Sequence, residues 1–262
     1  MGWLQPAGAT VTPVVVPEEL LLFESEDSIS YELGFKGVMM EGAVRLNGSL
    51  YYQDFEDYIS RLNSLSIRGE SGQIENSGLT VNGDAEVWGA ELDFTALLSE
   101  NWFLGGSLSY SESEYSDGTE LPCNEFDDDG APVIPEGQSV ALCDVGGSAI
   151  GSSPEFTASV NSEYTIPFDR VEGYGRILYT YTGERDSDID NVDPYHMVNL
   201  YLGVREEQWN VELFATNLFD EEALRGGGGT EATALVRREP TGYGLRFLVP
   251  GRRIGLSASY RW

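Results

Sequence analysis

The last ten residues of the chain, 253–262, read R-I-G-L-S-A-S-Y-R-W, and their side chains alternate strictly between two classes. Ile254, Leu256, Ala258, Tyr260 and Trp262 share one parity, and only arginine, glycine and serine lie between them. A β-strand projects successive side chains to opposite faces. The sequence therefore predicts a terminal strand with one fully apolar face, and whatever the chain folds into must place that face in an apolar surrounding.

The same alternation recurs along the chain in segments of about ten residues, which is typical of long strands. The segments are residues 28–36, 44–53, 88–96, 102–111, 155–166, 176–182, 198–205, 210–216 and 253–262. No helical period appears over a comparable length. The sequence therefore predicts an all-β protein of about nine strands, preceded by a proline-containing, acidic and irregular segment at residues 1–27.

The connections between these segments alternate in length. Short links are expected at residues 38–42, 97–101, 167–173 and 206–208, and long polar links at about 60–81, 117–152, 185–193 and 220–251. Short turns at one end and long loops at the other predict an antiparallel up-and-down meander. We expect residues 28–262 to form this meander as one domain.

Two all-β architectures bury such faces. In a transmembrane barrel the apolar face meets lipid, the other face meets water, and aromatic side chains gather at both strand ends. A soluble sandwich has shorter strands and a core of aliphatic side chains. The strands here are long and carry terminal aromatic residues, including Tyr52, Trp88, Trp102 and Tyr164. These features favour the transmembrane barrel, and a run of apolar residues long enough for a transmembrane helix is absent from the sequence.

Charge and composition exclude several functions. The chain has 15 basic and 44 acidic residues, a formal net charge of -29, so it would repel the phosphates of nucleic acid. His196 is the only histidine, and the sequence contains neither a G-x-S-x-G motif nor a phosphate-binding loop around Gly226–Gly229. We therefore expect no enzyme activity and no cofactor.

The long links contain two further features. If the sheet is a transmembrane barrel with short turns inside, its long loops are extracellular. Cys123 and Cys143 fall in the same long loop, which favours a disulfide over two free thiols or a metal site. The acidic clusters at residues 127–130 and 186–193 match Ca²⁺ in ligand type, but neither has the spacing of a calcium-binding loop. Solvated loops are the simpler interpretation, with divalent ions bridging them to lipopolysaccharide as a further hypothesis.

Four sequence blocks, taken in order, resemble those of TonB-dependent outer-membrane receptors. They are S-Y-E-L-G-F-K-G at residues 30–37, preceded by Pro17 and Glu18; N-G-D-A-E-V-W-G-A-E-L-D at 82–93; N-V-E-L-F-A-T-N-L-F-D-E-E at 210–222; and the aromatic-ended final strand. The resemblance implies a 22-stranded barrel with an N-terminal plug in its lumen. Nine strands cannot close such a barrel, so we expect its C-terminal part, in a chain lacking the plug, the TonB-contacting segment and the export signal. The alternative is a complete small barrel with one more strand within residues 1–27.

The resemblance also implies a function: TonB-energised uptake of a scarce nutrient, such as a siderophore, vitamin or oligosaccharide, across the outer membrane of a Gram-negative bacterium. Its partners would be membrane lipid, the remaining plug and barrel strands, the TonB complex and the barrel assembly machinery. That machinery would read Gly255, Ala258, Tyr260 and Trp262, although many family members end in Phe. On parity alone, Arg176, Tyr201, Arg205 and Glu212 are candidates to contact plug or ligand. A passive porin or a surface adhesin with acidic loops is the alternative function.

Overall fold

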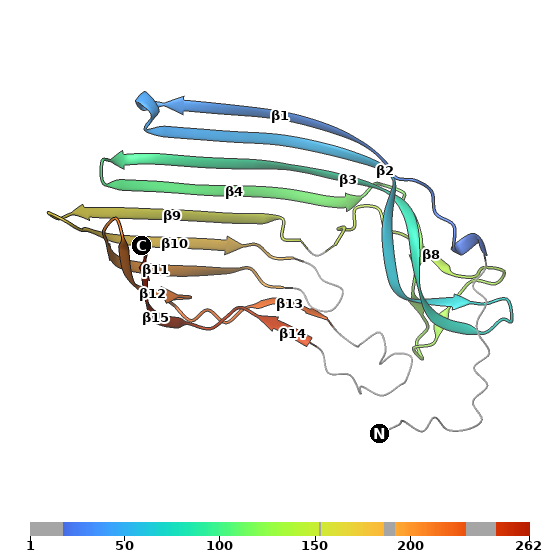
Figure 1. Ribbon diagram of the computed structural model, residues 1–262. Helices are drawn as coiled ribbons and strands as arrows, with labels where there is room; N and C mark the ends of the chain where they lie inside the picture. The colour runs from blue at the N-terminus through green and yellow to red at the C-terminus, as the bar shows by residue number, and fades with distance from the viewer. Residues whose placement is uncertain (1–17, 152, 186–191, 229–244) are drawn as a thin grey trace, which may run out of the picture.

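The computed structural model describes residues 18–151, 153–185, 192–228 and 245–262. Over these residues nine strands form one antiparallel sheet, in the order β1-β2-β3-β4-β9-β10-β11-β12-β15 (Figure 1). Their bounds are β1 Asp27–Met39, β2 Val44–Arg68, β3 Ile74–Ser99, β4 Trp102–Tyr115, β9 Phe156–Pro167, β10 Glu172–Thr182, β11 Tyr195–Arg205, β12 Trp209–Thr216 and β15 Arg253–Tyr260. The predicted all-β meander of nine strands is confirmed. Within the described residues the sheet is open, with β1 and β15 as its edges.

The connections follow the predicted alternation. The four short links lie together at one end of the sheet, and the long loops extend from the other end (Figure 1). The link from β1 to β2 contains the short 3₁₀ turn η2 (Met40–Gly42), in which three successive residues have positive φ: 52° at Met40, 56° at Glu41 and 98° at Gly42. Such left-handed backbone reverses the chain within a few residues.

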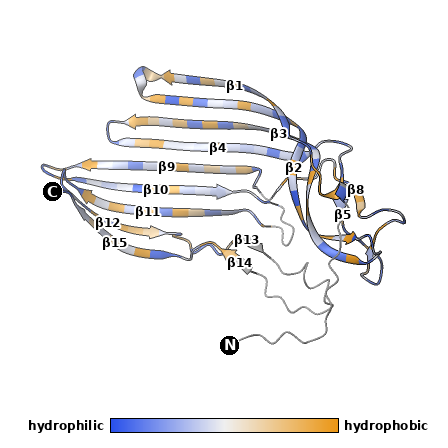
Figure 2. Cartoon of the chain, turned by 45° about the vertical axis from the view of Figure 1, so that its right-hand side comes forward, coloured by the Kyte–Doolittle hydropathy of each residue, from blue (hydrophilic) through white to orange (hydrophobic). Residues whose placement is uncertain are grey.

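The sheet has one face of exposed apolar side chains. Leu33 is 74% exposed and Leu256 is 71% exposed, although both lie in regular strands. The register places residues of one class side by side: Leu33 pairs with Leu50, Leu50 with Ala90, and Leu213 with Leu256. Hydrophobic residues recur along most strands, with hydrophilic residues between them (Figure 2). An apolar surface this continuous is far larger than the scattered apolar residues of a soluble monomer, so it requires an apolar surrounding.

Aromatic side chains mark both ends of this apolar face. Trp88 lies against Tyr110 with ring centroids 5.2 Å apart, near the long-loop end of the strands. At the short-turn end, Trp102 meets Tyr164 edge to face at 6.4 Å. Two aromatic rows separated by aliphatic residues are the pattern that amphipathic rings form at the two interfaces of a bilayer.

The predicted polar loop at residues 60–81 was wrong. Strand β2 continues to Arg68 and β3 begins at Ile74, so the two strands form a long hairpin that bends away from the sheet (Figure 1). The register shifts between Phe55 and Tyr58 and again between Leu62 and Leu65. Each shift is a β-bulge, which reverses the faces to which the following residues point. The alternation in the sequence is broken at these two places, which is why the segment resembled a loop.

The far end of this hairpin carries a small hydrophobic core of its own. Leu65, Ile67 and Leu79 pack with Val140 from the loop that follows β4, and Ile67 is 0% exposed. That loop contains four short strands, β5 (Glu120–Cys123), β6 (Glu125–Phe126), β7 (Pro132–Val133) and β8 (Ala141–Asp144), which pair as β5-β8 and β6-β7. We call residues 58–83 together with 119–145 the distal subdomain. Two segments that were predicted to be loops are therefore packed together as one unit.

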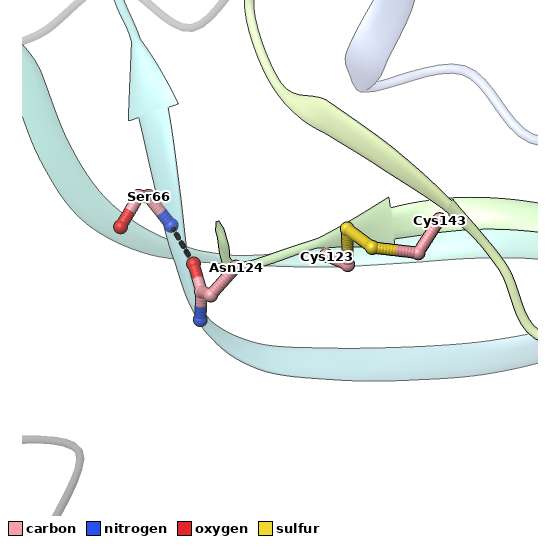
Figure 3. The surroundings of a disulfide bond; sticks show 4 residues. All are labelled: Ser66, Cys123, Asn124 and Cys143. Carbon is pink, nitrogen blue, oxygen red and sulfur yellow. Dashed lines mark hydrogen bonds between the residues drawn. A yellow bond between two sulfur atoms is a disulfide. The ribbon is translucent and has the colours of Figure 1, made fainter. Parts of the chain in front are cut away.

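A disulfide and one arginine fasten the distal subdomain. Cys123 and Cys143 are joined, as the sequence predicted (Figure 3). Beside the disulfide, the Asn124 side-chain oxygen accepts a hydrogen bond from the Ser66 backbone N–H at 2.7 Å. The Arg68 guanidinium donates to the carbonyl oxygens of Ile134, Pro135 and Gln138 at 2.8–3.1 Å. The loop is thus attached to the hairpin at both its base and its middle.

Three further expectations concern segments near the ends of the chain and the long loops. Residues 18–26 of the segment expected to be irregular form no strand, and Glu18–Leu20 is a 3₁₀ turn, η1. The link at about 220–251 was expected to be a long polar loop, but Leu224–Gly228 forms strand β13, paired with β14 (Leu245–Leu248), because backbone pairing needs no side chain. Residues 1–17 and most of the acidic cluster at 186–193 lie outside the described residues. No helix among the described residues is long and apolar enough to cross a membrane.

The disulfide leads to the first prediction. For a loop of this size, cross-linking removes chain entropy worth about 3 kcal/mol from the unfolded state. Cys143→Ser is therefore expected to raise the rate at which proteinase K cleaves residues 124–142 by on the order of a hundredfold. The double variant Cys123→Ser/Cys143→Ser is the matched control. It also lacks the disulfide but leaves no free thiol, so it should be cleaved at the same rate as the single variant. Equal cleavage of the variant and the parent protein would contradict a stabilising role.

Candidate functional site

The polar face of the sheet gathers charged side chains from four adjacent strands. Arg176 on β10 pairs with Tyr201 on β11, and Gly203, two residues further on, pairs with Glu212 on β12. Arg205 lies two residues beyond Gly203 and so on the same face. The four residues that parity singled out, Arg176, Tyr201, Arg205 and Glu212, are therefore neighbours in space. Their proximity does not test the role predicted for them.

Arg176 makes three contacts within this group. Its Nη2 lies 3.4 Å from Glu212 Oε2, and its Nη1 lies 3.9 Å from Glu163 Oε2 on β9. The guanidinium carbon lies 4.5 Å from the centroid of the Tyr201 ring. Stacking on an aromatic face suits the planar, weakly hydrated guanidinium better than it would suit an ammonium group. Arg176 is thus oriented by two carboxylates and one ring.

Arg205 repeats this arrangement nearer the short-turn end. Its Nε donates to Glu172 Oε1 at 2.6 Å, and its Nη2 lies 3.0 Å from Glu163 Oε1. Its guanidinium carbon is 4.7 Å from the centroid of the Tyr174 ring. Glu163 therefore bridges the two arginines, with one carboxylate oxygen directed to each. Its shared position makes it the centre of the network.

Tyr174 connects the two arginine groups. Its ring is nearly buried, at 7% exposure, and its hydroxyl lies 2.8 Å from Glu212 Oε2 and 3.0 Å from Asn210 Oδ1. The ring lies across Gly203, where an added Cβ would be 2.5 Å from Tyr174 Cζ. Gly203 therefore provides the space that the ring occupies. We call Glu163, Glu172, Tyr174, Arg176, Tyr201, Arg205 and Glu212 the arginine cluster.

The arginine cluster remains open to the space in front of the sheet. The side chains of Arg176 and Arg205 are 41% and 40% exposed, so part of each guanidinium is available to a partner. A hollow of about 460 Å³ lies beside Arg176, lined also by Phe103, Asn161 and Leu178. Leu178, an exception in the alternating pattern, thus contributes an apolar patch to a polar surface. The surface offers guanidinium donors, carboxylate acceptors and a ring within a few ångströms.

Sequence reasoning missed four residues of this site. Glu163, Glu172, Tyr174 and Gly203 were not singled out. Extending the parity of Arg176 back along β10 would have reached Tyr174 and Glu172. The role of Gly203 leaves no trace in an alternation of side-chain classes. It follows only from the ring that lies across it.

Other candidate groups lie elsewhere. His196 is on the apolar side of β11, where its ring stacks on Tyr179 with centroids 6.2 Å apart. In the described part of the chain no group of three His, Cys, Asp or Glu side chains is placed to hold a metal ion. Asp127, from the first acidic cluster, instead accepts hydrogen bonds from the backbone N–H groups of Asp129 and Ala131. The described residues thus provide the polar face, and its arginine cluster, as the candidate site.

The four residues of the expected assembly signal lie on and just beyond the edge strand β15. Ala258 and Tyr260 are on the apolar face, and Trp262, past the end of the strand, is fully exposed. Gly255 is on the polar face, where an added Cβ would be 2.5 Å from Cζ of Phe214 on β12. The glycine therefore has a packing role in this hairpin. Recognition by an assembly machinery stays a prediction.

Comparison with known proteins now identifies the family. Residues 16–218 match the family model described as TonB dependent receptor-like, beta-barrel, which is well over half of the chain. The chain belongs to the TonB-dependent receptor family. Its open nine-stranded sheet is therefore a segment of the family's barrel wall, and the resemblance drawn from four short sequence blocks is confirmed.

Solved structures of receptors share the fold at low sequence identity. The ferric yersiniabactin uptake receptor FyuA from Yersinia pestis aligns with a TM-score of 0.57 at 18% identity, over 91% of this chain and 30% of that one. The copper transporter OprC gives 0.57 at 16% identity, over 91% and 32%. The ferripyoverdine receptor of the outer membrane of Pseudomonas aeruginosa gives 0.53 at 13% identity, over 91% and 28%. The present chain thus spans about 30% of the length of these structures.

The close fit of Tyr174 over Gly203 leads to a prediction. Gly203→Ala is expected to displace the ring, to break its hydrogen bonds to Asn210 and Glu212, and to lower the free energy of unfolding by about 1–3 kcal/mol. The measurement is the temperature or urea dependence of heat-modifiable mobility on gels. Gly37→Ala is the matched control, because its added Cβ meets only the Leu46 carbonyl oxygen, at 3.6 Å. Equal losses in the two variants would contradict the assigned role.

A second prediction concerns the bridging carboxylate. Glu163→Gln keeps the size of the side chain but removes the charge shared by Arg176 and Arg205. Because both arginines are partly exposed, we expect a loss of only about 1 kcal/mol, which should diminish at high salt. A double-mutant cycle with Arg205→Ala measures the coupling. Glu91→Gln, also on the polar face but outside the arginine cluster, is the control, and an equal effect there would refute a special position for Glu163.

Proposed function

We propose that this chain is the C-terminal part of an outer-membrane receptor that takes up a scarce nutrient with energy supplied through TonB. The observation that supports this most strongly is the match to the receptor barrel family together with a sheet that is apolar on one face and polar on the other. The named structural neighbours include two iron-chelate receptors and a copper transporter. A siderophore, a vitamin or an oligosaccharide is the proposed class of nutrient.

The apolar face would meet the lipid of a Gram-negative outer membrane. Strands can cross a bilayer only if every backbone N–H and C=O is paired, which the long antiparallel ladders achieve between neighbouring strands. The aromatic rows at the two ends of the apolar face suit the two membrane interfaces. The short turns would then face the periplasm, and the distal subdomain would lie outside the cell. In this orientation, the end of the chain would present Gly255, Ala258, Tyr260 and Trp262 to the barrel assembly machinery.

Strand direction restricts what can close the barrel. In a meander of nine strands, β1 and β15 run in the same direction. Closure with antiparallel pairing throughout therefore needs an odd number of additional strands. A second copy in the same membrane orientation would instead pair β15 with β1 in parallel. A 22-stranded barrel leaves thirteen strands, an odd number, to be supplied by the rest of the protein. A preceding barrel segment would therefore lie between β15 and β1.

The arginine cluster would face the lumen of that barrel, where the plug domain lies in this family. Oriented, partly exposed guanidinium groups bind carboxylates and backbone carbonyls strongly, because they offer several donors in a fixed plane. Arg176, Tyr201, Arg205 and Glu212 are therefore proposed to contact the plug or the passing ligand. Glu163 and Glu172 would hold the arginines in position for this contact.

Liposome swelling in a solution of a small neutral sugar tests this function with the full-length protein. A plugged receptor is expected to leave the swelling rate at the background level, and removal of the plug is expected to raise it severalfold. Fractionation should place the protein in the outer membrane. Swelling by the intact protein would support a passive porin instead, and recovery of the folded protein without detergent would refute the membrane assignment altogether.

A further inference from the structure

The pairing of β12 with β15 is interrupted by a short segment that follows β12. Strand β12 ends at Thr216, and the following residues, Asn217–Asp220, read N-L-F-D. Two of them have left-handed backbone, with φ of 50° at Asn217 and 60° at Asp220. Pairing then resumes: the Val249 N–H donates to the Ala223 carbonyl oxygen, and β13 pairs with β14. A break of this kind leaves backbone groups that need other partners.

The side chain of Asn217 supplies those partners. Asn217 is 3% exposed, and its amide nitrogen donates to the carbonyl oxygens of Glu221 at 2.9 Å and Pro250 at 3.0 Å. Its amide oxygen accepts the Glu221 N–H at 2.8 Å. Its own backbone N–H donates to Oδ1 of Asn199 on β11, also at 2.8 Å. The buried side chain of Asn217 thus joins the two ends of the last long connection, and its backbone N–H attaches them to β11.

Asp220 makes a second link across the same break. Its Oδ1 accepts the backbone N–H of Arg252 at 2.7 Å, and its Oδ2 lies 4.0 Å from Arg252 Nη2. The Leu218 N–H donates to the Val198 carbonyl oxygen at 2.8 Å, which attaches the segment to β11. Arg252 immediately precedes β15. Asp220 therefore fixes the residue from which the terminal strand begins.

We propose that Asn217 and Asp220 form a clasp that sets the register of the terminal strand β15 against β12. In most hairpins a tight turn fixes the register, but residues 217–252 form a connection far too long for that. A slip by one residue would turn every apolar side chain of β15 to the polar face, and a slip by two would misplace each cross-strand pair. The clasp provides the fixed point that a turn would otherwise provide.

The clasp also lies between the last long connection and β15. Asn217 and Asp220 hydrogen-bond to Pro250 and Arg252, which lie between that connection and β15. Asn217 and Asp220 are positioning residues that act through the backbone of residues 250–252.

Cysteine cross-linking in outer-membrane vesicles tests the register directly, using the full-length protein. Val211 and Ala258 are direct partners, so a Val211→Cys/Ala258→Cys pair should oxidise efficiently. A Val211→Cys/Leu256→Cys pair, offset by two residues, should not. Adding Asn217→Gly, which keeps the left-handed backbone but removes the amide, is expected to lower the first cross-link severalfold and to raise the second.

Variants of Asp220, and a control at Asn47, complete the test. Asp220→Ala should shift the cross-links as Asn217→Gly does, whereas Asp220→Asn keeps an acceptor for the Arg252 N–H and should resemble the parent. Asn47→Ala, within the regular pairing of β1 with β2, is the control and should change neither cross-link. A simple loss of stability would lower both cross-links without exchanging them.

The outcomes are distinct. If Asn217→Gly and Asp220→Ala both keep the parental cross-linking pattern in folded protein, the clasp does not set the register and the proposal is overturned. If Asn217→Gly does not reach the membrane, Asp220→Ala decides the question by the same pattern. Failure of the parent protein itself to enter the outer membrane would count against the proposed function and not against the clasp.

Discussion

Backbone hydrogen bonding is the constraint on which the rest of this structure depends. A strand that faces an apolar surrounding must pair every N–H and C=O with its neighbours, since an unpaired group there costs several kcal/mol. The inner strands have a neighbour on each side to pair with, whereas β1 and β15 each have one within the described residues. Only with such pairing can an entire face carry leucine, isoleucine and aromatic residues. Where the ladder breaks, at the bulges of β2 and at Asn217–Asp220, the structure supplies specific substitutes. At Asn217 the substitute is a buried side chain.

The same two-faced ladder assembles the candidate site. Because polar side chains alternate with apolar ones, charged residues on four adjacent strands are brought to one face within a few ångströms of each other. Glu163 bridges Arg176 and Arg205, and each guanidinium stacks on a tyrosine ring. Glycine makes room for one of these rings, so the site depends on an absent side chain as much as on present ones. A rigid wall of this kind suits the proposed role as a contact surface for plug or ligand.

The distal subdomain follows a different rule from the wall. There the apolar side chains of both strands lie on the inward face, where they meet Val140 and the loop closed by Cys123 and Cys143. Its core is an ordinary buried one, and a disulfide and Arg68 fasten it. Strands β2 and β3 thus carry outward-facing apolar side chains within the wall and inward-facing ones in the distal subdomain.

The sequence by itself determined the strand count, the meander, the two faces and the family, because all of these follow from a period of two and from local motifs. Parity alone also selected Arg176, Tyr201, Arg205 and Glu212 as one group. Only the tertiary structure decided what depends on register and on breaks in the ladder: the extension of β2 and β3, the bridging by Glu163, the ring of Tyr174 over Gly203 and the clasp at Asn217. Each joins residues distant in the chain through a pairing offset that no local pattern encodes. A single bulge changes that offset without changing the composition of the segment.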